Sequence, residues 1–401
     1  MLRSLPLVLL LVFAGCTDAP VAASVSVADA LAGDTTGYAR ADRVRPFAFP
    51  ADHGPHLAFK TEWWYVTGNL RATDGSGRRF GVQFTVFRSA LAPAQAGAAP
   101  RASAWGTTQL YMAHVAVGDV AGGRFYSQER FARGAAGLAG ASSDPVQAFL
   151  GPVEMVATGP PEAGGAVPLR LTGSAEGAAF ALDARPTKPV VLQGDRGLSQ
   201  KGAEAGNASY YYAQTRMATT GTVTLPGGEA IPVEGLTWLD REWSTSALAA
   251  GQTGWDWFAL HLDTPAEDGA AGGRDLMLYQ LRGADGAKDP LSEGSLVDAA
   301  GRKTRLAAAD FSLEPLARWT SPGGAAYPTR WRVRVPSQNI DVTVTAAIDA
   351  SELDATVRYW EGAVDVAGST AGTGFLEMTG YADTGLRRAG ALSRTESGAS
   401  D

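Results

Sequence analysis

Two short segments combine acidic and aromatic side chains in a way that could support acid–base chemistry. Residues 236–243 contain Asp240 and Glu242 among tryptophans, and residues 255–257 place Asp256 between two tryptophans. A carboxyl group beside apolar aromatic surface has a raised pKa, as a general acid needs near neutral pH. These segments therefore supply three candidate catalytic acids.

The same carboxylates also have a structural interpretation, in which each pairs with an arginine and joins parts of the fold. Glu62, which precedes Trp63 and Trp64, has the same two interpretations. If residues 255–257 form a strand, Asp256 faces away from both of its tryptophan neighbours. The sequence leaves both interpretations open.

The four histidines lie in distinctive local sequences and differ in their expected roles. His53 and His56 lie in a loop-like segment before the first expected strand, and His114 and His261 interrupt apolar strand-like segments. Two loop histidines and one strand histidine could form a three-histidine metal site, but no metal-binding signature is complete. We expect His53 and His56 to hydrogen-bond the loop that plugs one end of a barrel. His114 and His261 are either hydrogen-bonded interior residues or proton carriers in a pocket.

Composition excludes several function classes. The 34 Lys and Arg against 41 Asp and Glu give a net charge of −7, and without a basic block nucleic-acid binding is not expected. A single cysteine excludes an intrachain disulfide framework and a cysteine-rich metal site. The sequence also lacks a Gly-x-Ser-x-Gly nucleophile elbow, a phosphate-binding loop, a His-Glu-x-x-His motif and a dinucleotide fingerprint.

The lone cysteine belongs to an expected export signal. Residues 1–16 contain a basic residue, a short apolar run and small residues before Cys16, in the manner of a bacterial lipobox. We expect Cys16 to be the lipidated mature N-terminus, followed by a flexible tether over residues 17–40. The protein would then be exported and held to a membrane by its lipid, with a disordered tail over residues 386–401.

Past residue 40 the hydrophobic pattern has the period of β-strands. Residues 61–71 and 79–88 are aromatic and β-branched runs separated by an Asp-Gly-Ser-Gly turn, which predicts a hairpin. Similar runs recur through residues 109–238 between Gly, Pro, Asp and Asn clusters. The pattern predicts an all-β protein built as a sandwich or barrel.

A weak internal repeat indicates that one β-domain is duplicated. Residues 60–65 align with residues 252–257, and five of the ten tryptophans fall in each half of the chain. Self-similarity at half the chain length favours two related antiparallel barrels or sandwiches. We place the first domain at residues 41–246 and the second at residues 247–385.

Several motifs together resemble those of the AttH/CrtC-like family of lipocalin-like proteins. The likeness runs from about residue 45 to residue 381, and its motifs lie at residues 49–56, 61–70, 188–194, 207–212, 240–243 and 254–258. The family includes carotenoid 1,2-hydratases and exported proteins labelled predicted secreted hydrolases. The resemblance implies two tandem lipocalin-like β-domains, in agreement with the repeat.

The resemblance also implies a chemistry that needs neither a metal nor an organic cofactor. A hydratase of this kind protonates an isolated C=C bond, and water captures the resulting tertiary cation. Asp240 would be the acid and Asp256 the second choice, with Glu242 nearby and His114 or His261 handling the water. The aromatic residues expected to contact an isoprenoid or other long apolar ligand are Trp63, Trp64, Tyr65, Trp243, Trp255, Trp257 and Tyr279.

Two other functions remain open from the sequence. The protein could bind or carry an apolar ligand without converting it, or serve in envelope attachment. It could also be a hydrolase, although the missing nucleophile elbow counts against this.

Overall fold

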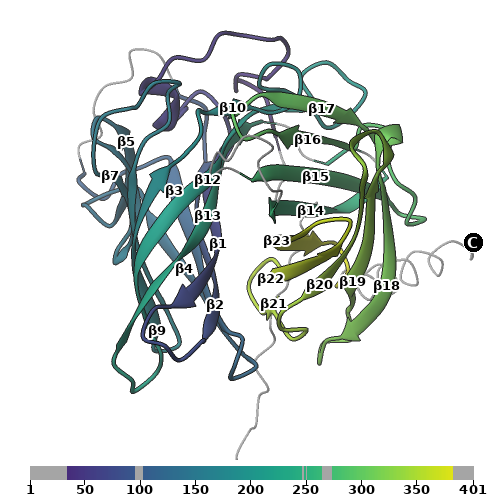
Figure 1. Cartoon of the computed structure of the whole chain (residues 1–401). Coiled ribbons are helices and arrows are strands. Elements are labelled where there is room, and N and C mark those ends of the chain that lie inside the picture. Colours follow the sequence, from purple (N-terminus) through teal and green to yellow (C-terminus); the bar gives the residue numbers. More distant parts are fainter. Residues whose placement is uncertain (1–33, 95–102, 246–247, 250, 264–272, 383–401) are drawn as a thin grey trace, which may run out of the picture.

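The computed structural model describes residues 34–94, 103–245, 248–249, 251–263 and 273–382. Its strands form two antiparallel sheets, one from each half of the chain (Figure 1). The first is a nearly closed barrel and the second a half-barrel, which confirms the predicted all-β class with two tandem lipocalin-like domains. Cys16, most of the predicted tether and the predicted tail lie outside the described residues.

The first sheet has 13 strands, in the order β4-β3-β2-β1-β13-β12-β9-β8-β7-β6-β5, with β10 and β11 also paired to β12. The 3₁₀ helix η1 (Ala51–His53) precedes it. The strand bounds are β1 (Thr61–Ala72), β2 (Arg79–Ala90), β3 (Gln109–Asp119), β4 (Arg124–Arg133), β5 (Ala139–Ser143), β6 (Val146–Leu150), β7 (Val153–Ala157), β8 (Leu169–Ala175), β9 (Ala178–Pro186), β10 (Val191–Leu192), β11 (Leu198–Gln200), β12 (Ala208–Thr224) and β13 (Ala230–Ser244).

The second sheet has 10 strands, in the order β17-β16-β15-β14-β23-β22-β20-β19-β18, with β21 paired to β22. Two further 3₁₀ helices are η2 (Ala308–Asp310) and η3 (Pro336–Gln338). The strand bounds are β14 (Gln252–Asp263), β15 (Arg274–Gly283), β16 (Glu293–Val297), β17 (Lys303–Ala307), β18 (Ser312–Thr320), β19 (Ala326–Val335), β20 (Ile340–Ala346), β21 (Glu352–Leu353), β22 (Tyr359–Gly368) and β23 (Ala371–Thr379).

The two sheets share one pairing scheme. In each, the first strand pairs on one side with the second strand and on the other side with the last strand of the same domain. Thus β1 lies between β2 and β13, and β14 lies between β15 and β23. The repeat seen in the sequence therefore places residues 60–65 and 252–257 at matching positions of the two domains.

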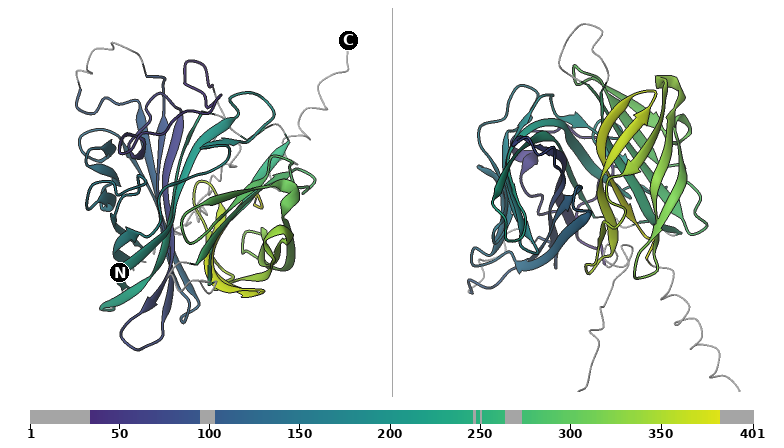
Figure 2. Two further views of the ribbon diagram at one scale, coloured as in Figure 1. Left: turned by 45° about the horizontal axis from the view of Figure 1, so that its top comes forward. Right: turned by 60° about the horizontal axis from the view of Figure 1, so that its bottom comes forward.

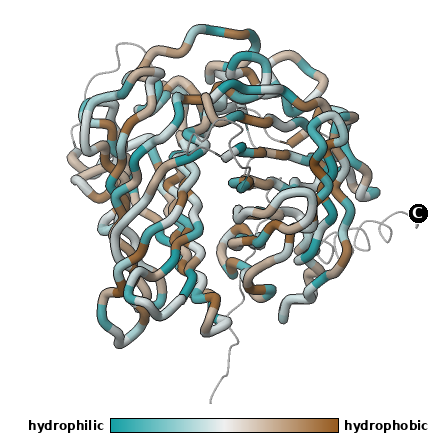
Figure 3. Tube along the Cα trace, in the orientation of Figure 1, coloured by the Kyte–Doolittle hydropathy of each residue, from teal (hydrophilic) through white to brown (hydrophobic). Residues whose placement is uncertain are grey.

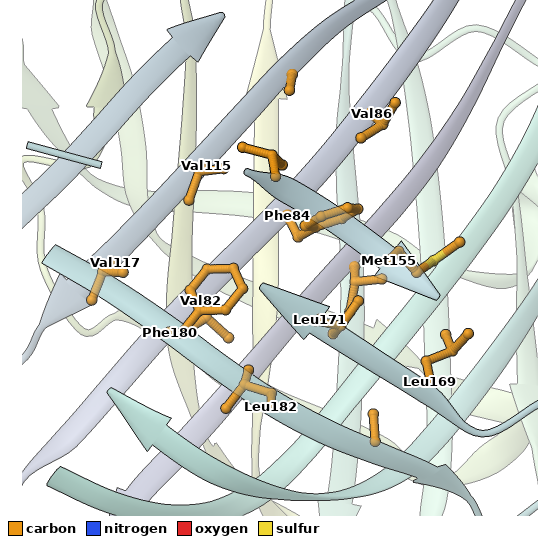
Figure 4. Close-up of a cluster of buried hydrophobic side chains, with 14 of the residues drawn as sticks. Val82, Phe84, Val86, Val115, Val117, Met155, Leu169, Leu171, Phe180 and Leu182 are labelled. Atoms are coloured by element: carbon orange, nitrogen blue, oxygen red, sulfur yellow. The ribbon is translucent and has the colours of Figure 1, made fainter. Parts of the chain in front are cut away.

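Each domain has its own hydrophobic core, produced by alternation along the strands (Figure 3). In β9 every second residue is buried, which puts Phe180 and Leu182 inside the first barrel (Figure 4). They lie in the same cluster as Phe84, Val115 and Leu171. Each such side chain contributes about 1.5–3 kcal/mol through removal from water.

The two sheets pack against each other (Figure 2). Buried residues of β1, β12 and β13 form one cluster with residues of β14, β15, β22 and β23. Tyr65 on β1 meets Trp257 on β14 edge to face, with ring centroids 5.3 Å apart. A second contact is an ion pair between Lys188 and Asp275, whose side chains are 2% and 0% exposed, with Nζ 2.7 Å from Oδ2. The contact between the domains is therefore both apolar and charged.

Close packing at one glycine of this contact allows a prediction about stability. A Cβ added at Gly81 on β2 would lie 2.9 Å from the Cβ of Ala363 on β22, so one strand must move. We expect Gly81→Ala to lower the free energy of unfolding by about 1–3 kcal/mol through overpacking. Gly228→Ala is the matched control, because its Cβ has only Leu225 O at 3.4 Å. Urea denaturation of both variants checks this, and equal midpoints would contradict it.

Among the described residues, none of the helices has the length and apolar character to span a membrane.

Candidate active site

A cavity of about 210 Å³ lies between the two sheets. Its aromatic lining residues are Trp63, Tyr65, Phe87, Tyr211, Trp255, Trp257, Tyr279 and Tyr359. Its acidic lining residues are Asp240, Glu242, Glu361 and Glu377. Both domains thus contribute rings and carboxyl groups to one space.

Strand alternation decides which residues of the repeat face this cavity. On β1, Trp63 and Tyr65 line the cavity, whereas Trp64 between them packs in the first core. On β14, Trp255 and Trp257 line it in the same way. The repeat therefore presents two rings from each domain on facing surfaces.

Asp240 on β13 is a buried cavity acid with two hydrogen-bond donors fixed on it. Its Oδ2 accepts a hydrogen bond from Tyr211 Oη at 2.6 Å, and its Oδ1 accepts one from Trp238 Nε1 at 2.7 Å. The residue is 4% exposed. Burial raises the pKa of Asp240 to about 8 despite these donors. The carboxyl group is therefore mostly neutral at pH 7, as expected for a general acid.

The second domain supplies two carboxyl groups that we did not predict from the sequence. Glu377 on β23 is partly exposed, and its Oε1 accepts a hydrogen bond from Trp255 Nε1 at 2.9 Å. Glu361 on β22 stands directly opposite in register and is fully buried. Tyr65 Oη donates to Glu361 Oε2 at 3.0 Å. Burial raises the pKa of Glu377 to about 7 and holds that of Glu361 well above its ordinary value.

A sequence signal for Glu377 exists. Residues 238–240 read Trp-Leu-Asp and residues 375–377 read Phe-Leu-Glu, an aromatic-Leu-acid pattern near the end of each half. Extending the repeat from the first strand of each domain to the last would have found it.

Glu242 is held in an ion pair at the cavity wall. Lys201 Nζ lies 3.3 Å from Glu242 Oε1 and 4.1 Å from the ring centroid of Tyr279. Ser209 Oγ donates a hydrogen bond to the same carboxylate oxygen. Burial would lower the pKa of Lys201, but the Glu242 carboxylate raises it above its ordinary value. This pair gives the cavity a fixed polar side.

His114 lines the cavity with both ring nitrogens engaged. Nδ1 lies 2.6 Å from Tyr359 Oη, and Nε2 lies 2.9 Å from Glu129 Oε2. Gln83 Nε2 donates to Tyr359 Oη at 3.1 Å. The simplest consistent assignment has Nε2–H donating to Glu129 and Tyr359 donating to Nδ1. His114 therefore orients the Tyr359 hydroxyl.

Comparison with known proteins identifies the family of this chain. Residues 40–381 match the AttH-like family. The chain belongs to this family. The match confirms the resemblance of the sequence motifs to those of AttH/CrtC-like proteins.

Three known proteins match this AttH-like chain in sequence or in structure. A crystal structure of a protein described as an AttH from Nitrosomonas europaea has a TM-score of 0.70 and 34% identity, covering 86% of this chain and 99% of that one. The structure of kievitone hydratase from Nectria haematococca has a TM-score of 0.61 and 14% identity, covering 83% and 92%, and so shows the shared fold. Kievitone hydratase of Fusarium solani subsp. phaseoli is 30% identical over 96 residues, which are 23% of this chain and 26% of that protein. That match spans about a quarter of the relative.

Two tryptophans expected to bind ligand lie away from the cavity of this AttH-like protein. Trp64 is 1% exposed in the first core, and its Nε1 donates to His53 O at 2.9 Å. Trp243 stacks on His56, with ring centroids 3.7 Å apart. Both lie on the strand face opposite to the cavity-lining residues of β1 and β13, because neighbouring residues of a strand face opposite ways.

Two residues expected to act in catalysis also lie outside the cavity lining. Asp256 faces away from its tryptophan neighbours, as the alternation predicted, and its carboxylate contacts Arg282 Nε at 3.0 Å and Tyr381 Oη at 2.8 Å. His261 Nε2 lies 2.8 Å from Thr215 O. Burial lowers the pKa of His261 to about 4, so its ring is neutral at pH 7. Asp256 is therefore a carboxylate paired with an arginine, and His261 is a hydrogen-bonded interior residue.

The loop histidines bond within and beside their loop. His53 Nδ1 lies 2.5 Å from Tyr212 Oη, and its Nε2 lies 2.8 Å from Gly165 O. His56 Nε2 lies 3.0 Å from Asp52 Oδ1. Within residues 34–382, leaving aside the undescribed gaps, no group of three His, Cys, Asp or Glu residues is arranged to hold a metal ion.

Proposed function

We propose that the cavity binds an apolar unsaturated molecule and adds water across one of its C=C bonds by acid–base catalysis. The observation behind this proposal is Asp240, whose pKa of about 8 keeps it a neutral acid in an aromatic cavity. The relationship to proteins named kievitone hydratase supports addition of water as the reaction class. We propose an isoprenoid chain as the substrate class, because the aromatic lining offers it an apolar surface.

The first step transfers the Asp240 proton to the less substituted alkene carbon. The π electron pair forms the new C–H bond, and the other carbon becomes a tertiary cation. Electron-rich ring faces stabilise a cation within about 6 Å, and Trp257 and Tyr65 line the cavity near Asp240. Water then attacks the cation and gives up one proton, so the sum is alkene plus water to alcohol.

A direct assay tests this function. The protein is incubated with geraniol, farnesol or geranylgeraniol in isotopically labelled water, and products are examined by mass spectrometry. We expect a hydroxyl group that carries oxygen from the labelled water. Binding of these alcohols without any product would contradict hydration and favour a carrier.

The proposed acid also predicts a pH dependence. The donors on Asp240 are Tyr211 and Trp238, and Glu242 and Glu377 raise its pKa by like charge. An acid must be protonated to act, so kcat/KM should fall as the pH rises through about 8. A rate that stays constant well above that pH would exclude Asp240 as the proton donor.

We also propose that the protein is an exported lipoprotein anchored through Cys16, on the basis of residues 1–16. Expressed in a bacterium, the wild-type chain should sediment with membranes and incorporate labelled palmitate. Cys16→Ser should abolish the labelling and move the protein to the soluble fraction. Unchanged labelling in that variant would contradict lipidation at Cys16.

A further inference from the structure

We propose that Glu377 is the general base that takes the proton from the attacking water, and that it and Asp240 are the same position in the two duplicated domains. This inference rests on the proposed hydration and names its second catalytic residue. It is carried by strand register, cavity lining and hydrogen-bond partners.

The register of the central strands relates the two carboxyl groups. Tyr65 on β1 stands opposite Asp240 on β13, and Trp257 on β14 stands opposite Glu377 on β23. Tyr65 and Trp257 are themselves matched by the repeat. The last strand of each domain therefore delivers one carboxyl group to the cavity from the equivalent place.

The surroundings of the two groups are alike in one respect and differ in another. Each carboxyl group accepts an indole N–H, from Trp238 in one domain and Trp255 in the other. The next strand outward places Ala213 opposite Asp240 but Glu361 opposite Glu377. At this position the second domain thus has a cross-strand pair of carboxyl groups, whereas the residue opposite Asp240 in the first domain is an alanine.

Glu361 and Glu377 lie opposite each other, and their surroundings determine which of these two carboxyl groups carries a proton. Glu361 is 0% exposed, and its Oε1 has no hydrogen-bond partner among the described residues. An ionised Glu361 would leave that oxygen both charged and unpaired in the interior, which is costly. Glu361 therefore keeps a proton, and the negative charge of the pair falls on Glu377, the more exposed of the two cavity-lining residues.

The groups that face Glu377 are consistent with this assignment. They are Glu361 on β22, Tyr65 on β1, Asp240 and Glu242 on β13, and Lys201, which pairs with Glu242. The Glu377 carboxylate raises the pKa of Asp240 through space. An ionised base on one wall therefore helps to keep the acid on the other wall protonated, as two separated pKa values require.

The proton balance closes over one turnover. Asp240 loses its proton to the alkene carbon, water forms the new C–O bond, and the released proton goes to the Glu377 carboxylate. The enzyme is then left with ionised Asp240 and protonated Glu377. Transfer of that proton from Glu377 to Asp240 through solvent water restores the starting state.

The test compares Glu377→Gln with Glu314→Gln, an exposed glutamate on β18, in the prenyl alcohol assay. We expect Glu377→Gln to lower kcat at least about 100-fold, and the control to match wild type. The wild-type kcat/KM should also fall as the pH drops through about 7, and this acidic limb should disappear in Glu377→Gln. Glu377→Asp, which can still accept a proton, should retain the acidic limb and recover part of the rate.

The possible outcomes are distinguishable. If wild type hydrates the alcohols and Glu377→Gln does so equally well, the base assignment is overturned while the hydratase function stands. A wild-type profile without an acidic limb overturns it too, whatever the variants do. If wild type hydrates none of the alcohols, the proposed function fails and the base assignment fails with it. Circular dichroism and the unfolding midpoint show whether each variant is folded.

Discussion

Replacing Asp240 with asparagine is expected to reduce the hydration rate by ~100- to 10,000-fold, the usual contribution of a general acid. The amide has no proton acidic enough to transfer to an alkene carbon. The change is nearly isosteric, and the amide oxygen can still accept a hydrogen bond from Tyr211 or Trp238. The loss should therefore be in kcat, with only a small change in affinity for the alkene.

The controls separate catalysis from binding and folding. Fluorescence quenching of the cavity tryptophans by farnesol measures binding directly, because Trp63, Trp255 and Trp257 line the cavity. Asp240→Asn should quench with a similar dissociation constant and lose the basic limb of the pH profile. Retention of wild-type kcat would show that the proton comes from elsewhere.

Much of this site was predictable from local sequence because a strand fixes the direction of alternate side chains. The repeat between residues 60–65 and 252–257 indicates two strands whose rings line one cavity, and its aromatic neighbours make Asp240 a candidate acid that lines the same cavity. The same alternation argues against ligand contact by Trp64, because Trp63 and Tyr65 on either side of it face the cavity. Residue type alone does not distinguish these three aromatic residues as ligand contacts.

Other parts of the site depend on pairing between distant strands, which local patterns do not show. Glu377 reaches the cavity because β23 pairs with β14, more than a hundred residues away in sequence. Lys201 comes from the connection after β11 and meets Glu242 only because β11, β12 and β13 are neighbours. Lys201 has no such local signal, and the aromatic-Leu-acid pattern at Glu377 becomes informative only when the repeat is extended to the last strand of each domain.

Glu62 has a structural role, which also depends on pairing between strands that are distant in sequence. Its carboxylate forms ion pairs with Arg88 on β2 and Arg241 on β13, and all three side chains are 0% exposed. Burial would raise the pKa of Glu62, but Arg241 and Arg88 hold it well below its ordinary value. The backbone N–H of His56 also donates to it, at 3.0 Å to Oε2. This network fixes the loop before β1 to the barrel.

Glu62→Gln should therefore lower the free energy of unfolding by about 3–5 kcal/mol, because two buried guanidinium groups lose their counter-charge. Asp183→Asn is the matched control. Its partner Arg170 is exposed on the surface, and such a pair contributes under about 1 kcal/mol. Because the folded-state pKa of Glu62 is depressed, wild type should lose this stability as the pH falls below its ordinary value of 4.5, whereas Glu62→Gln should not. Equal urea midpoints for the two variants would contradict a stabilising role for the network.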